Sequence, residues 1–100
     1  MDIQKHLEFL TREEIKDMIS PKLRAITAIW EDNRAIISFY FDGEISDIDK
    51  DAASDACTYI IAHFPDASLE ENYIRQDYPQ SLPKNFLVYI RGWKRPGPFH

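Results

Sequence analysis

Three aspartates at alternate positions, Asp47, Asp49 and Asp51, are the closest approach of this sequence to a metal-binding motif. Aspartates at positions 1, 3 and 5 begin the calcium loop of an EF-hand, which also needs glycine at position 6 and glutamate at position 12. Ala52 and Thr58 stand at those two positions. The calcium motif is therefore incomplete, and the aspartates are better explained as the acidic first turn of a helix, where the helix dipole favours negative charge.

The other groups able to bind a metal or attack a substrate are Cys57 and three histidines, His6, His63 and His100. No histidine and cysteine have the spacing of a zinc site. Cys57 lies on the apolar side of a predicted helix, so we expect a buried thiol rather than a nucleophile. The sequence leaves open a catalytic arrangement of Cys57 with a histidine and an acid, but its spacing does not indicate one. We predict no catalytic residue, no metal ion and no cofactor.

A pair of carboxylates, Glu71 and Asp77, flanks Tyr73 and Arg75 on one face of a predicted strand. Paired carboxylates can act as general acid and base or hold a metal ion. Cross-strand pairing of Arg75 on a half-exposed sheet face explains the same residues without any chemistry.

The charge distribution favours a basic protein partner. The net charge is −5, and residues 31–72 hold eleven acids but two bases. Such a segment repels a nucleic-acid backbone and attracts a cationic surface. A solvated acidic face without a partner is the alternative. If a partner binds here, the expected contact residues are the acids of the hairpin turn and of residues 42–55: Glu31, Asp32, Asp42, Glu44, Asp47, Asp49, Asp51 and Asp55.

The elements that position these groups are predicted from the spacing of apolar residues. Residues 2–20 have helical spacing, and Thr11 with the acids after it fits a capping box, which favours two short helices meeting at Thr11 over one. Residues 23–30 and 35–41 suit strands, and the polar turn between them predicts an antiparallel hairpin.

In the second half of the chain, Ser46 caps a helix whose apolar stripe extends to Phe64. Strands are predicted over residues 69–78 and 86–93. The order α-β-β-α-β-β then predicts one α+β domain over residues 1–95, with a four-stranded antiparallel sheet and both helices on one face. Residues 96–100, rich in proline, are predicted to be a loose tail.

The size and the apolar runs indicate a small protein of the cytoplasm. A chain of 100 residues is long enough for one domain. No apolar run approaches the roughly 20 residues needed to cross a bilayer, and the first residues do not resemble a signal peptide. One cysteine cannot form an intramolecular disulfide, which favours a reducing compartment.

Several short runs resemble small bacterial immunity proteins of contact-dependent growth inhibition and related polymorphic toxin systems. These runs are Leu23-Arg24-Ala25, Trp30-Glu31-Asp32-Asn33, residues 39–46 from Phe39 to Ser46, and residues 73–79 from Tyr73 to Pro79. The resemblance implies a non-enzymatic protein that binds and neutralises a cognate toxin domain. The acidic charge adds the expectation of a cationic nuclease as the toxin, since its active site must hold phosphates. A small structural or regulatory interaction domain without a toxin partner is the alternative.

Overall fold

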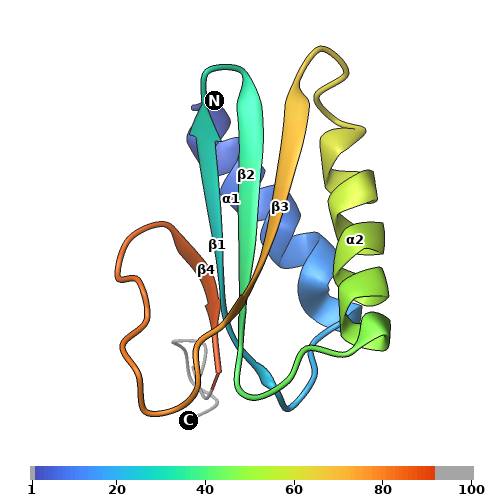
Figure 1. Ribbon diagram of the computed structural model, residues 1–100. Coiled ribbons are helices and arrows are strands. Elements are labelled where there is room, and N and C mark those ends of the chain that lie inside the picture. Colours follow the sequence, from blue (N-terminus) through green and yellow to red (C-terminus); the bar gives the residue numbers. More distant parts are fainter. Residues whose placement is uncertain (1, 92–100) are drawn as a thin grey trace, which may run out of the picture.

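The computed structural model describes residues 2–91, which form one four-stranded sheet with two helices on one of its faces (Figure 1). Along the chain the elements are α1 (Ile3–Glu14), the 3₁₀ turn η1 (Ile15–Asp17), β1 (Leu23–Glu31), β2 (Arg34–Phe41), α2 (Asp47–Ile61), β3 (Ser68–Arg75) and β4 (Leu87–Ile90). The helices and strands follow the predicted order, and the 3₁₀ turn η1, which was not predicted, is added after the first helix. The predicted tail of residues 96–100 lies outside the described residues.

The prediction of a wholly antiparallel sheet is wrong, because the strand order is β3-β2-β1-β4 and β3 runs parallel to β2. Helix α2 returns the chain to the end of the sheet where β2 began, so β3 follows the same direction as β2 (Figure 1). Residues 76–86 then carry the chain past β2 and β1, and β4 pairs antiparallel with β1 at the opposite edge. Strands β3 and β4 therefore lie at opposite edges of the sheet and do not pair with each other.

The first helix differs from the prediction of two helices meeting at Thr11. Asp2 caps α1 by accepting a hydrogen bond from the Gln4 N–H at 3.0 Å. Thr11 lies buried inside α1, and its hydroxyl donates to the Leu7 carbonyl at 2.7 Å instead of capping a second helix. A single helix extended by a 3₁₀ turn results.

The hairpin and the cap of α2 agree with the sequence. Asp32 and Asn33 have φ of 50° and 58°, which is the geometry of the two-residue turn that joins twisted antiparallel strands. Ser46 caps α2 by accepting from the Asp49 N–H at 3.1 Å. Strands β3 and β4 are shorter than predicted: the chain leaves the sheet at Gln76, and Phe86, with φ of 63°, interrupts the extended backbone before β4. The predicted end at Trp93 lies outside the described residues.

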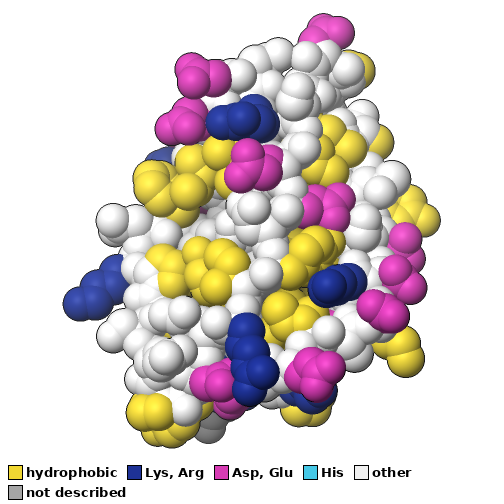
Figure 2. Space-filling model, viewed as in Figure 1, with side chains coloured by type: hydrophobic (Ala, Val, Ile, Leu, Met, Phe, Trp, Pro, Cys, Tyr) yellow, Lys and Arg dark blue, Asp and Glu magenta, His cyan; other side chains and the backbone are white. Residues whose placement is uncertain are grey.

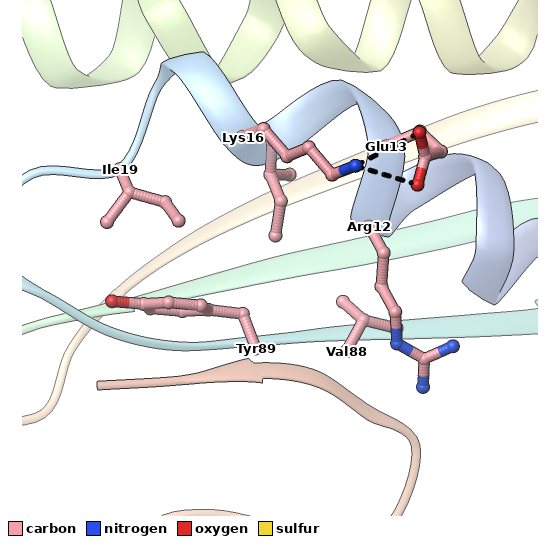
Figure 3. Close-up of a pocket in the computed structure, with 7 residues that line it drawn as sticks. Arg12, Glu13, Lys16, Ile19, Val88 and Tyr89 are labelled. Carbon is pink, nitrogen blue, oxygen red and sulfur yellow. Dashed lines mark hydrogen bonds and ion pairs between the residues drawn. The ribbon is translucent and has the colours of Figure 1, made fainter. Parts of the chain in front are cut away.

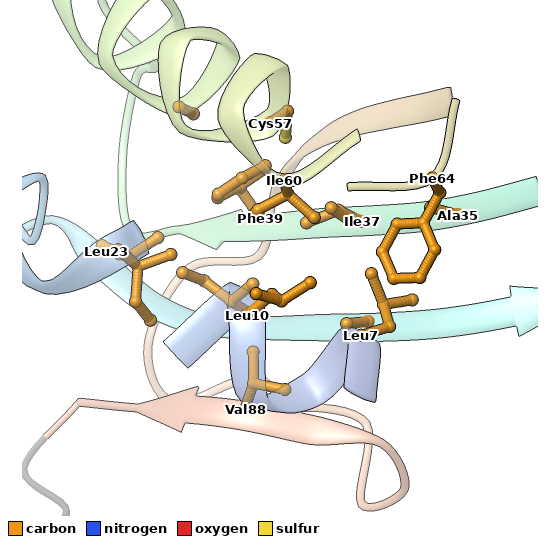
Figure 4. Packing of buried hydrophobic residues seen from close by; sticks show 14 of the residues in the cluster. Leu7, Leu10, Leu23, Ala35, Ile37, Phe39, Cys57, Ile60, Phe64 and Val88 are labelled. Carbon is orange, nitrogen blue, oxygen red and sulfur yellow. The ribbon is translucent and has the colours of Figure 1, made fainter. Parts of the chain in front are cut away.

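The core lies between the helices and the sheet. Figure 4 shows Ile60 of α2 and Leu10 of α1 directed toward Ile37 and Phe39 of β2. No described helix covers the opposite face of the sheet, where half-buried apolar side chains alternate with polar ones: Ile29, Ile36, Tyr40, Ile74, Leu87 and Ile90. Figure 2 shows apolar, basic and acidic side chains intermingled on that face.

Candidate functional site

The predicted acidic residues fall into two groups at opposite ends of the sheet. Glu31 and Asp32 lie at the β1–β2 turn, whereas Asp42 and Glu44 follow the other end of β2. The eight residues of β2 separate the groups by roughly 25 Å, at about 3.3 Å per residue. The hairpin acids therefore do not form one patch with Asp42 and Glu44.

Three of the acids share the solvent side of α2. Asp47, Asp51 and Asp55 recur every four residues, and all three are exposed. We call these three residues the α2 acidic face; Figure 2 shows acidic side chains gathered along this edge of the molecule. Two exposed apolar side chains flank them, Ile48 at 80% and Tyr59 at 64% exposure. Within residues 2–91 none of the three aspartates forms an ion pair, so their charge is directed to solvent.

The remaining candidates near α2 are engaged within the fold to different degrees. Asp49 is half-buried in the first turn. Asp42 accepts hydrogen bonds from Arg91 Nη2 at 3.2 Å and from the Tyr78 N–H at 3.3 Å. Glu44 is exposed. Asp42 therefore has a structural role, and Glu44 extends the exposed acids toward the end of the sheet.

Arg24 is a buried charge that sequence analysis did not single out. It is 7% exposed, and its guanidinium donates to the carbonyls of Gln76 and Gln80. The guanidinium also lies 5.7 Å from the centre of the Tyr78 ring. The available signal was a single basic residue in a mostly apolar strand, but the partners of Arg24 are more than 50 residues away in the chain.

The carboxylates Glu71 and Asp77 do not form a catalytic pair. Asp77 accepts from the Gly43 N–H at 2.7 Å and from Arg75 Nε at 3.1 Å. The hydrogen bond from Arg75, followed by that from Gly43, lowers the pKa of Asp77. The hydrogen bond between Arg75 and Asp77 also raises the pKa of Arg75. Glu71 instead accepts from the Tyr73 hydroxyl, and burial followed by this hydrogen bond raises the pKa of Tyr73. Each carboxylate has its own structural partner.

Cys57 is fully buried on the inner side of α2, as predicted. Burial, followed by the nearby negative charge of Glu71, raises the pKa of the Cys57 thiol to about 12. A thiolate is needed for nucleophilic attack, so this thiol is inert in the folded protein.

We expect native Cys57 to react with a disulfide reagent at pH 8 at least 100 times more slowly than the unfolded chain. A pKa raised from 9.0 to about 12 lowers the thiolate fraction about 1,000-fold, and burial also blocks access. Absorbance of the released thiol in buffer and in denaturant measures both rates. Complete labelling of the native protein within seconds would contradict this placement.

His6 packs within the fold and His63 contacts a backbone carbonyl, and no metal centre is formed within the described ranges. The His6 ring packs edge-on against Phe64, with centroids 5.4 Å apart. His63 Nδ1 lies 3.1 Å from the Tyr59 carbonyl. Among residues 2–91, no group of three His, Cys, Asp or Glu residues is placed to hold a metal ion, and this includes the aspartates of α2. His100 lies outside the described residues.

A groove of about 430 Å³ runs between the end of α1 and β4 (Figure 3). Ile15, Ile19 and Val88 line its apolar wall, and the Tyr89 ring forms one side. Its Lys16 pairs with Glu13 at 3.1 Å, and its Arg12 pairs with Glu8 at 3.7 Å. The described lining contains no nucleophile beside a base, so its chemistry is that of an apolar surface rimmed by ion pairs.

Within residues 2–91, the acids of α2 and the neighbouring Tyr59 lie on the open surface and do not line an enclosed cleft. No described helix has the length and apolar character required to cross a membrane.

A comparison with curated proteins finds no match. A comparison with family models matches residues 6–92 to the MafI2 immunity protein. Because this match covers most of the chain, the protein belongs to the MafI2 immunity protein family.

Proposed function

We propose that this protein neutralises a cationic toxin domain, a nuclease, by binding it in the cytoplasm through the α2 acidic face and without catalysis of its own. Membership of an immunity protein family supports the toxin-neutralising role. The observation that supports the finer proposal is the set of three exposed aspartates, Asp47, Asp51 and Asp55, on one side of α2.

The physical argument rests on charge and exposure together. A nuclease must hold phosphates, so its active site is basic, and a surface with several negative charges attracts it over about 10 Å at 0.1 M salt. Charge alone gives fast association more than affinity. The exposed side chains of Ile48 and Tyr59 beside the acids supply apolar area that a partner would bury.

The direct test is co-purification with the product of each neighbouring gene, followed by an assay of any bound product on DNA and RNA. We expect a stable complex in which nuclease activity is lost. A complex with a toxin that does not cleave nucleic acid would reject the nuclease assignment. Absence of any complex, with both proteins folded, would reject the toxin-binding role for this pair.

A further inference from the structure

The connection from β3 to β4 makes several hydrogen bonds where it leaves the sheet. Residues 76–81, here called the Tyr78 loop, are fixed by hydrogen bonds to the end of β2 and to each other. Gln76 N–H donates to the Phe41 carbonyl at 2.8 Å, and Gln80 N–H donates to the Asp77 carbonyl at 2.8 Å. The Asp77 carboxylate accepts from Gly43, as described above. The loop therefore has a fixed shape without belonging to a helix or a strand.

The buried side chain of Arg24 holds this loop by hydrogen bonds to its backbone. Its two donors reach the carbonyls of Gln76 and Gln80, at the two ends of the turn that carries Tyr78. Burying a guanidinium carries a desolvation cost, which hydrogen bonds to carbonyls offset. The same guanidinium faces the Tyr78 ring, a contact that favours one orientation of the ring.

The Tyr78 side chain nevertheless points to solvent and is 70% exposed. An aromatic ring so exposed contributes little burial to the fold, although the loop that carries it is held rigidly. Rigid presentation lowers the entropy lost when a partner is bound, and tyrosine is enriched among residues that dominate binding energy. The arrangement fits a binding anchor better than a packing residue.

The charges around Tyr78 are arranged as pairs. Arg75 pairs with Asp77 at 3.1 Å, and Arg91 pairs with Asp42 at 3.2 Å. A partner that covers the ring therefore meets a rim of compensated charge. Asp42 of this rim stands at the end of β2, and the exposed Glu44 lies between it and the first residue of α2 in the chain.

We propose that Tyr78 is the aromatic anchor of the toxin interface, inserted into an apolar pocket of the toxin domain. This inference rests on the proposed function, and it assigns the Tyr78 loop and the α2 acidic face to one binding surface. Arg24 is the positioning residue that holds the anchor.

The test is the affinity of the purified toxin domain for Tyr78→Ala, measured by calorimetry. We expect Kd to rise at least tenfold while thermal unfolding changes little, because the side chain is exposed. Tyr78→Phe retains the ring and should bind within a few-fold of the wild type. Phe9→Ala on α1 is the matched control, since this ring is 55% exposed on the helical layer; its Kd should not change.

A double-mutant cycle tests the role of Arg24. Arg24→Lys should weaken binding when Tyr78 is present and have no further effect in Tyr78→Ala. Equal weakening in both backgrounds would show a purely structural role for Arg24. Wild-type affinity in Tyr78→Ala would overturn the anchor while leaving the proposed function intact, whereas failure of the wild-type protein to bind the toxin domain would reject the proposed function itself.

Discussion

Replacing Phe39 by alanine is expected to remove about 3–5 kcal/mol from the free energy of unfolding. Phe39 is fully buried in the middle of β2, and its ring stacks on Tyr73 with centroids 5.6 Å apart. It also lies beside Ile26 of β1 and below α2, so its removal leaves a cavity that touches both layers. Because domains of this size are stable by about 5–15 kcal/mol, this single change should bring the protein close to unfolding.

Urea unfolding followed by circular dichroism measures the loss. The control is Phe9→Ala, which removes the same atoms from an exposed position and should change stability by less than about 1 kcal/mol. A loss below about 1 kcal/mol for Phe39→Ala would mean that Phe39 is not a central residue of the core.

The elements that depend on neighbouring residues could be predicted from the sequence. The β1–β2 hairpin needs a turn that tolerates positive φ, and Asp32-Asn33 is such a turn. The start of α2 needs a cap and an acidic first turn, which Ser46 and the following aspartates provide. Each of these signals lies within a few residues of the structure it determines.

The partner of β3 could not be predicted in the same way. Its alternation of apolar and polar residues fits either edge of the sheet, in either direction. What places it beside β2 is the packing of α2 against the sheet, which brings Tyr73 onto Phe39 and Ser54 within 3.3 Å of Glu71. These contacts join residues far apart in the chain, and no local pattern records them.

The candidate site likewise has parts that depend on neighbouring residues and parts that depend on contacts between distant residues. The helix that carries Asp47, Asp51 and Asp55 could be predicted, and the structure places all three aspartates on one exposed side of it. The distance from Glu31 to these acids depends on the length and direction of β2. Counting charges along the sequence gives no information about that distance. The support of Tyr78 by Arg24 spans 54 residues of the chain, so only the folded structure reveals it.

Reversing two charges on α2, Asp47→Lys with Asp51→Lys, is expected to slow association with a cationic toxin about tenfold or more at low salt. Both side chains are exposed, and neither has an ion pair within the described part of the chain, so the change acts on the field outside the protein. The fold should persist, because loss of acids near a helix start costs a few tenths to about 1 kcal/mol each. Stopped-flow association at two salt concentrations measures the rate and its salt dependence, which should become flatter.

The matched control is Glu31→Lys with Asp66→Lys, which makes the same change in net charge at the other end of the sheet. Both residues are exposed, and Asn33 links the two turns by donating to the Asp66 carbonyl at 2.8 Å. If the α2 acidic face guides the toxin, this control should slow association much less than the α2 variant. Its reversed charges lie beyond the C-terminal end of α2, at least about 15 Å along the helix axis from Asp51 at about 1.5 Å per residue, and this exceeds the screening length of about 10 Å. Equal slowing in both variants would assign the effect to net charge, and slowing in the control alone would place the toxin at the hairpin end.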